Sequence, residues 1–551
     1  MSDSRNSEQL STAEKEKPNM TKDIATVDDL LDKTSNFEPG TILSLKPGVY
    51  RINDPIVLSN DITFIGQGDT NESVNIVCDN PSAFIIDSGD VRFKNVTIQA
   101  NPKVVPPDED LVKGTLLLRK GQLQVSNSKI LAQSVPCVHI TGSESNAAIE
   151  KTDLKNGSSG VVVDKKGNAK VSQCNIVDTK INGVIIVDGS QLIIDKTTIR
   201  GGQHGIVAFI GTGEEPSATI TDCQLNGITD AALLLQGGKI ICENTLVSLC
   251  KEFGILFVPD RIRSVGHFTN CEFFNNYNTN ILLRDCSVEF NDCRIRCTNE
   301  FLETRINDAR RNHDRPIGVE IVENCEIIMD RCVFDFPGFG AKFHETEPSQ
   351  YGCLFRECKF FQHETAILLG SNAESTQDVS SFLPKLDSYG VFEKCEIANF
   401  RNSAVQSLSR DSRILFKDCH IHDGGGQGGF DENSSSGISF IGQDFDGPKG
   451  TIENCRFENV KGLAIEIGSA ADVTVCKSHI DGAVAGIVVD TSTMCRVDDC
   501  SIQNIKFIGI VMNSEKACEF RRNKISNCGR EAWQLGPNTI NTIREDNDPN
   551  E

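Results

Sequence analysis

The stretch "QCNIVDTKINGVIIV", from Gln173 to Val187, contains both elements of a repeat that runs through most of the chain. The first element is a polar residue, a Cys or another small residue, any residue, and then Ile, Leu or Phe. The second element is a small residue that opens an apolar run, here Gly183, nine residues after Cys174. Short segments in which apolar and polar residues alternate, or in which all residues are apolar, are typical of β-strands when turn residues flank them.

The first element returns at intervals that mostly lie between 21 and 27 residues. Its cysteine copies are Cys174, Cys223, Cys271, Cys293, Cys332, Cys358, Cys395, Cys419, Cys455 and Cys500, and its weaker copies are Val96, Ser128, Thr152, Thr197, Asn244, Ser478 and Asn523. Each unit has room for a few short strands and none for a helix of normal length. Units of this kind stack into a parallel β-helix, in which each coil buries its inward residues on its neighbours.

Strand alternation predicts which side chains face inward. Cys395 and Ile397 are expected inside the solenoid and Glu396 outside, and the same holds in the other repeats, including Leu246 after Asn244. Most of the 22 cysteines therefore read as buried thiols, ten of them in one internal column. No C-x-x-C pair and no zinc spacing occurs, so no metal or other cofactor is expected.

The net charge argues against some classes of partner, and the N-terminus indicates a cellular compartment. The chain has 55 Lys and Arg against 77 Asp and Glu, a formal charge of -22, which disfavours nucleic acid and anionic membranes as partners. No apolar window is long enough to span a bilayer. The first 20 residues have no apolar core of a secretory signal, and with so many thiols this predicts a cytoplasmic protein.

The segment "GTILSLKPGVYRINDPIVLSNDITFIGQGD", from Gly40 to Asp69, resembles the first coils of the pectate-lyase-like superfamily of right-handed parallel β-helices. Before it, "TVDDLLDKTSNF" at 26–37 is similar to the amphipathic helix that caps such solenoids. The resemblance implies an all-β, single-stranded right-handed parallel β-helix of about 17–18 coils with an N-terminal helical cap. In style the chain is closest to the intracellular, non-secreted members.

The expected organisation has four parts. Residues 1–24 are predicted to be a disordered polar leader, 25–35 the capping helix, 36–536 the β-helix, and 537–551 an acidic C-terminal tail.

The catalytic patterns that the resemblance would imply are incomplete. "GQHG" at 202–205 offers His204, but the Asn-Thr-Asp and Arg-Ile-Lys of polygalacturonase-type enzymes do not follow. No outward column of carboxylates suggests the calcium cluster of pectate lyases. "NHDRP" at 312–316 matches only a fragment of the alginate-epimerase pattern. Whether the chain is an enzyme therefore stays open at this point.

Insertions are the expected place for a site, because loops vary while a solenoid stays constant. The insertions 298–316 and 424–436 leave the same corner and could wall a cleft, whereas 371–389 leaves another corner. The first loop holds the catalytic candidates Arg311, His313, Asp314 and Arg315, and the ligand-binding candidates are Arg310, His363, Arg401, His420, His422 and Asp423. The alternative is that the loop's charges pair with one another and that the histidines are solvated strand residues.

Two functions follow from these observations. The first is a cytosolic β-helix scaffold that presents a rigid face and a cleft to a protein or polysaccharide ligand. The alternative is a carbohydrate-active enzyme, a lyase or epimerase, that uses the Arg/His-rich loop.

Overall fold

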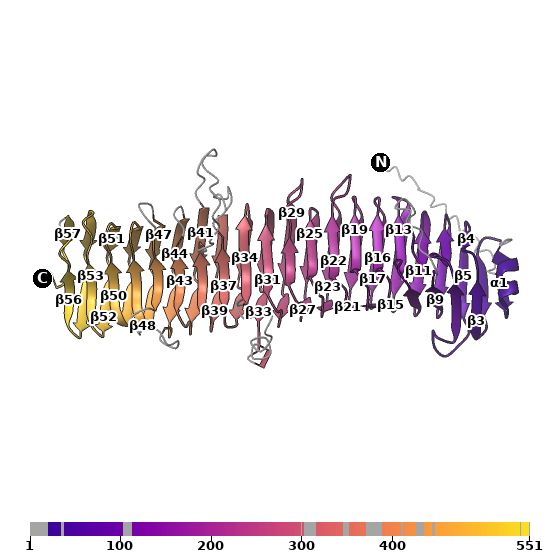
Figure 1. The fold of residues 1–551 in the computed structure, drawn as a ribbon, viewed down its shortest axis with the longest axis horizontal. Helices are drawn as coiled ribbons and strands as arrows, with labels where there is room; N and C mark the ends of the chain where they lie inside the picture. Colours follow the sequence, from indigo (N-terminus) through magenta and orange to yellow (C-terminus); the bar gives the residue numbers. More distant parts are fainter. Residues whose placement is uncertain are drawn as a thin grey trace, which may run out of the picture.

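The computed structural model describes residues 20–34, 38–102, 113–298, 300–301, 316–344, 352–370, 388–408, 412–425, 435–442, 447–539 and 541–549. These residues form one long right-handed solenoid of about 19 turns (Figure 1). Each turn, called a rung below, gives one strand to each of three faces, and strands of successive rungs pair in parallel. The predicted all-β solenoid is confirmed, with slightly more turns than the 17–18 expected, because rungs near both ends lack the cysteine marker.

Face 1 is a sheet of 21 strands that precede the column residues. Its strands are β1 (Thr21–Ile24), β2 (Thr41–Leu45), β5 (Ile62–Gly66), β8 (Asp90–Lys94), β11 (Gly121–Ser126), β14 (Ser145–Glu150), β17 (Asn168–Ser172), β20 (Gln191–Asp195), β23 (Ser217–Thr221), β26 (Lys239–Glu243), β29 (Ser264–Thr269), β32 (Cys286–Asn291), β35 (Glu326–Asp330), β38 (Gly352–Arg356), β41 (Ser388–Glu393), β44 (Ser412–Lys417), β47 (Lys449–Glu453), β49 (Asp472–Cys476), β51 (Met494–Asp498), β54 (Cys518–Arg521) and β57 (Thr542–Glu545).

Face 2 consists of the strands that follow the column residues. They are β3 (Gly48–Ile52), β6 (Val74–Cys78), β9 (Thr97–Ala100), β12 (Lys129–Ala132), β15 (Asp153–Lys155), β18 (Asn175–Val177), β21 (Thr198–Arg200), β24 (Gln224–Asn226), β27 (Leu246–Ser248), β30 (Glu272–Phe274), β33 (Arg294–Arg296), β36 (Val333–Asp335), β39 (Lys359–Phe361), β42 (Glu396–Ala398), β45 (His420–His422), β52 (Ser501–Ile505), β55 (Lys524–Cys528) and the first halves of β48 (Arg456–Ile467) and β50 (His479–Val489).

Face 3 contains the apolar strands of the second repeat element. They are β4 (Ile56–Leu58), β7 (Phe84–Ile86), β10 (Leu116–Leu118), β13 (Val138–Thr141), β16 (Ser159–Asp164), β19 (Asn182–Val187), β22 (His204–Phe209), β25 (Ala231–Gln236), β28 (Phe253–Phe257), β31 (Thr279–Arg284), β34 (Ile317–Glu323), β37 (Phe339–Phe343), β40 (Thr365–Leu369), β43 (Ser403–Ser407), β46 (Ser436–Phe440), β53 (Ile508–Met512), β56 (Glu531–Leu535) and the second halves of β48 and β50.

The column between faces 1 and 2 explains why Cys, Ser, Thr and Asn interchange there. The Sγ of Cys419 lies 3.4 Å from the carbonyl oxygen of Lys417 and 3.2 Å from that of Phe392 on the preceding rung, so its single S–H has two acceptors in reach. Thr197 occupies the same position and accepts a hydrogen bond from the amide of Cys174 at 3.2 Å. The residue before the column usually has a positive φ, so the chain turns sharply and leaves inward backbone groups that need a small polar partner.

One rung differs from the predicted register. Thr245 and Val247 are buried at 1% exposure each and Leu246 faces outward, so the column residue is Thr245 rather than Asn244. Asn244 instead takes the positive φ of the turn. A shift of one residue reverses the facing of every side chain in a strand, which is why Leu246 was assigned to the wrong side.

Both ends of the solenoid differ from the expected boundaries. Residues 1–19 of the predicted leader lie outside the described residues, but β1 pairs with β2 and extends face 1. The helix α1 (Val27–Thr34) follows, with the side chain of Thr26 accepting from the amide of Asp29 at 3.1 Å. At the other end β57 pairs with β54, so face 1 continues beyond residue 536, where the tail was expected to begin.

Candidate functional site

The Arg/His-rich loop lies outside the described residues. This applies to the catalytic candidates Arg311, His313, Asp314 and Arg315 and to the ligand-binding candidate Arg310. The same is true of 371–387 and of 426–434, which make up most of the other two insertions. The cleft between loop walls and the enzyme that depends on it therefore stay predictions.

His363 is not a surface residue, contrary to the expectation. Its side chain is fully buried and packs edge-to-face against Phe336, with ring centroids 4.8 Å apart. Neither ring nitrogen has a hydrogen-bond partner of normal geometry among the described residues. Burial lowers the pKa of His363 to about 3, so the ring is neutral at physiological pH. The chain turns inward at this corner, and His363 fills the solenoid instead of facing a ligand.

Arg401 lies one rung further along the same corner and is exposed. Its amide donates to the carbonyl oxygen of His363 at 2.8 Å. The role of Arg401 in binding a ligand stays a prediction, whereas Phe400 beside it is buried at 2% exposure.

His420 and His422 face outward on face 2, as strand alternation predicts, and belong to a group called here the histidine patch. The patch consists of Glu396, His420, His422, Asp423 and Glu458, on three successive rungs. The two imidazole rings stack with centroids 4.2 Å apart. His420 Nε2 lies 2.8 Å from a Glu458 oxygen, and His422 Nδ1 lies 2.8 Å from an Asp423 oxygen. Each ring is therefore already held by a carboxylate of this chain.

The carboxylates of the patch stay ionised under mild acid. The hydrogen bond with His422 and a second one from Asn459 lower the pKa of Asp423. Burial acts to raise the pKa of Glu458, but hydrogen bonds from His420 and Arg456 outweigh it and lower the pKa. A patch whose charges are mutually satisfied is well suited to holding neighbouring rungs together and offers few free groups to a ligand.

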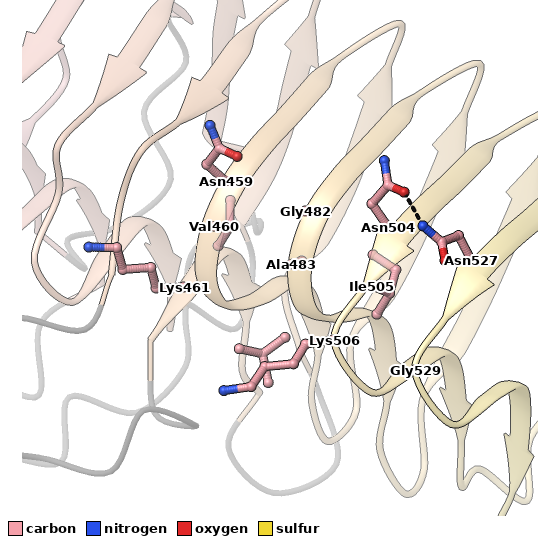
Figure 2. A pocket seen from close by; sticks show the side chains of 11 residues that line it. Asn459, Val460, Lys461, Gly482, Ala483, Asn504, Ile505, Lys506, Asn527 and Gly529 are labelled. Atoms are coloured by element: carbon pink, nitrogen blue, oxygen red, sulfur yellow. Dashed lines mark hydrogen bonds between the residues drawn. The ribbon is translucent and has the colours of Figure 1, made fainter.

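A groove runs along the corner between faces 2 and 3 near the C-terminal end and is called here the corner groove (Figure 2). Its volume is about 640 Å³. It spans four rungs and is lined by Asn459, Val460, Lys461, Gly482, Ala483, Val484, Asn504, Ile505, Lys506, Asn527 and Gly529. Figure 2 shows the three asparagines along one edge and the two lysines on the other side of the ribbon.

The asparagine edge follows from the backbone at this corner. Asn459, Asn504 and Asn527 each lie four residues after the column residue and have φ of 53°. Asn tolerates this left-handed conformation better than other non-glycine residues. Asn459 donates to Asp423 at 3.1 Å and Asn504 donates to Asp481 at 2.7 Å. The amides are thus fixed in a row along the groove.

The lining of the groove carries no carboxylate, although the chain as a whole has a charge of -22. Lys461 is exposed and forms no ion pair with any residue that the structure describes. The Nζ of Lys506 lies 5.5 Å from the centroid of the Phe507 ring, a cation–π distance. The groove therefore has two lysines on one edge and side-chain amides on the other, two of which are hydrogen-bonded to Asp423 and Asp481.

The groove was missed at the level of the sequence. The available signal was the Asn that recurs four residues after Cys455, Cys500 and Asn523, followed two residues later by Lys in two of the three rungs. Among the residues with assigned positions, no set of three or more His, Cys, Asp or Glu could hold a metal ion. None of the helices within those positions is long and apolar enough to cross a membrane.

Comparison with known proteins places the sequence in one family. The model of the "right handed beta helix region" matches residues 81–247, 210–382, 346–506 and 430–547. No curated protein matches the sequence.

Solved structures similar to this chain share little sequence with it. The N-terminal fragment of gene product 12 of bacteriophage Phi29 is 9% identical, with 92% of this chain and 88% of that chain covered and a TM-score of 0.43. The Dettilon tailspike protein is 12% identical, with 63% and 62% covered and a TM-score of 0.37. The catalytic domain of a GH87 alpha-1,3-glucanase in complex with nigerose is 12% identical, with 74% and 66% covered and a TM-score of 0.35. The chain spans less than two thirds of the tailspike and of the glucanase domain.

Proposed function

The chain belongs to the family of the right-handed beta helix region, and we propose that within this fold it is a non-catalytic binding module that holds an extended segment of a partner protein in the corner groove. The observation that supports this proposal is the groove itself. It crosses four rungs, with asparagine side-chain amides on one edge and two lysines on the other (Figure 2). Rigid solenoids use such extended surfaces for binding.

The lining favours a polypeptide over a sugar chain. None of its eleven residues is aromatic, so a sugar ring would find no flat apolar surface to stack on. The small side chains of Gly482, Ala483 and Gly529 allow a ligand backbone to approach closely. The side-chain amides can then bond to peptide carbonyl groups of that backbone.

Val484 offers a direct test because it lines the groove between Lys461 and Lys506 and is half-buried. Val484→Glu would place a carboxylate beside both lysines and compete with any ligand. A phage library of random linear peptides should yield binders to the parent that the Val484→Glu variant loses. Val162→Glu is the matched control, since Val162 is a half-buried outward valine on face 3 near the other end.

The same variants distinguish the competing ligand class. A panel of neutral and acidic oligosaccharides is tested in parallel with the peptides. Sugars that bind the parent and are lost in Val484→Glu, with no peptide doing so, would replace the protein ligand by a carbohydrate. Peptides that bind both variants equally would remove the groove from the function.

We also propose a reducing, cytoplasmic setting and a capping role for α1. All 22 cysteines are thiols rather than disulfides, and 19 of them are buried. Thiols that donate to backbone carbonyl groups inside the solenoid are suited to a compartment that keeps them reduced. Leu30 on α1 is fully buried, which supports the helix as a cover for the first rungs.

A further inference from the structure

A row of large apolar side chains faces outward on face 3 near the middle of the solenoid, on the strands from β16 to β31 (Figure 1). Its six members hold the same position on successive rungs, lie in register and are called here the apolar stripe: Val162, Ile185, Val207, Leu234, Leu256 and Leu282. Val207 is 8% exposed and the other five are half-buried, because neighbours in the stripe cover one another's sides.

The other faces show that this composition is unusual for an outward column. On the same six rungs the outward column of face 2 is polar with one exception: Asp153, Asn175, Thr198, Gln224, Leu246 and Glu272. Phe209, Phe253 and Val258 border the apolar stripe and are half-buried as well. The three insertions begin at residue 298 or later, so none of them leaves from these rungs. A contiguous apolar patch of this kind marks a contact surface.

We propose that the apolar stripe is the interface of a homodimer, in which face 3 of one copy packs on face 3 of a second copy with the two solenoids antiparallel. The twofold axis runs along the strands, midway between Val207 and Leu234. It brings each residue of the stripe against another residue of the stripe, and the strands of the two sheets stay aligned, as in ordinary packing of one sheet on another. This inference goes beyond the proposed function and does not depend on it.

The charges at the two ends of the stripe favour the antiparallel arrangement. Asp164 and Arg284 each stand two residues after an end member of the stripe, on the same side of it. The twofold axis places Asp164 against Arg284 of the second copy, and it does so twice. Asp164 also lies 3.1 Å from His139 Nε2 in its own chain, but a carboxylate accepts from more than one donor. In a parallel pair the two charges would stay five rungs apart, about 24 Å.

The rungs beyond the stripe fit the same axis. His139 would meet Glu320 of the second copy, and on the next rung Leu117 would meet Lys342. No two like charges therefore oppose each other in this column over ten rungs, from β10 to β37. Ten rungs of about 4.8 Å and strands of about 17 Å give a contact of about 800 Å² per copy, the usual size of a specific interface.

The proposed interface leaves the corner groove accessible. Face 3 begins at β4, so around this axis the face of the second copy overlaps the first as far as β43. The lining of the corner groove begins at Asn459 on β48 and lies beyond that overlap. The dimer would therefore present two grooves at opposite ends, and a monomeric variant would keep its own groove unchanged.

The oligomeric state of the full-length protein tests the proposal. Analytical ultracentrifugation of the parent at micromolar concentration should show twice the mass of one chain. Leu234→Glu places two carboxylates beside the twofold axis in an apolar contact, and should give monomers with an unchanged circular dichroism spectrum. Val511→Glu is the matched control, since Val511 is a half-buried outward valine of face 3 beyond the overlap, and it should stay dimeric. A monomeric parent, or a dimeric Leu234→Glu variant, would overturn the interface.

An exchange of charges tests the direction of the two copies. Asp164→Arg should weaken the dimer about tenfold, because like charges then meet at both ends of the stripe. Adding Arg284→Asp to the same chain should restore the affinity of the parent. The two residues are five rungs apart within one chain, so such a rescue can only arise between copies. A second exchange that restores nothing would overturn the antiparallel arrangement.

Discussion

Gly424 lies directly against the ring of Phe400 on the preceding rung: a Cβ on Gly424 would lie 2.1 Å from Cε1 of that ring. Phe400 is buried at 2% exposure, so the ring cannot move outward without leaving the core. The first glycine of the "GGGQGG" run is therefore required by packing. Its presence gives no support to a loop that folds over a ligand.

Gly424→Ala should lower the free energy of unfolding by about 1–3 kcal/mol, the usual cost of overpacking a core. Phe400→Leu makes room for the added methyl group. The double variant should therefore be less destabilised than the sum of the single ones, as measured by urea unfolding. Additive effects would mean that the two residues do not contact each other.

Replacing Cys395 separates the size of the thiol from its hydrogen bonds. Its single S–H has two acceptors in reach, the carbonyl oxygen of Phe355 at 3.4 Å and that of Glu393 at 3.6 Å from Sγ. Cys395→Ala should leave peptide binding intact and cost about 1 kcal/mol through a small cavity, in addition to the lost hydrogen bond. Cys395→Val fills the space and loses only the hydrogen bond, whose net contribution is about 1 kcal/mol because the Glu393 oxygen still accepts from the amide of Glu357 at 2.9 Å. In urea unfolding the Ala variant should therefore be the less stable of the two, and equal costs would mean that the cavity contributes nothing.

His363 should make the stability of the protein depend on pH. Its pKa is about 3 in the folded chain and 6.5 as the ordinary value. The unfolded chain therefore binds the proton first, and stability is complete above pH 6.5 and falls as the pH decreases toward 3. Between pH 7.5 and pH 5 the parent should lose about 2 kcal/mol more than His363→Leu, since 1.5 pKa units correspond to that energy. Identical pH profiles of unfolding would show that the imidazole becomes protonated inside the fold.

The thiols should be reduced and protected in the native protein. Burial raises the pKa of Cys137 and of Cys250 to about 12, so these groups are protonated and unreactive at neutral pH. A thiol reagent should react with the half-buried Cys297, Cys476 and Cys528 in the native state and with all 22 thiols in denaturant. A lower number in denaturant, restored by a reductant, would reveal disulfides and argue against a cytoplasmic location.

The fold could be predicted from the sequence because each rung repeats the same short pattern, a small residue and an apolar residue with a polar residue between them. Cys419 and Ile421 are buried and His420 faces outward, as expected, because a strand of a solenoid has one inside and one outside. Leu246 shows the limit. Asn244, Thr245 and Leu246 offer two acceptable registers, and only the stacking on the neighbouring rungs decides between them.

The site was less accessible to sequence reasoning. His363 stands five residues after its column cysteine, a position that is buried in other rungs too, as at Phe400 and Ile505. Arg401 stands six residues after Cys395 and is exposed, so the corner has its own inward and outward positions, which strand alternation alone does not give. The corner groove is formed by residues about 23 positions apart, such as Asn504 and Asn527, and each of them alone reads as a turn residue. Their alignment becomes apparent only when the rungs are stacked in register.

The parallel pairing of every rung with the next has a mechanical consequence. The backbone hydrogen bonds between rungs run along the long axis of the molecule, whereas the covalent chain runs around it (Figure 1). Tension applied between the two ends would therefore break the hydrogen bonds between rungs one pair of rungs at a time, and the rungs would separate one after another. A force applied across the axis, in contrast, would act on the covalent chain and the packed core of each rung. We therefore expect low resistance to extension along the axis and high resistance to compression across it.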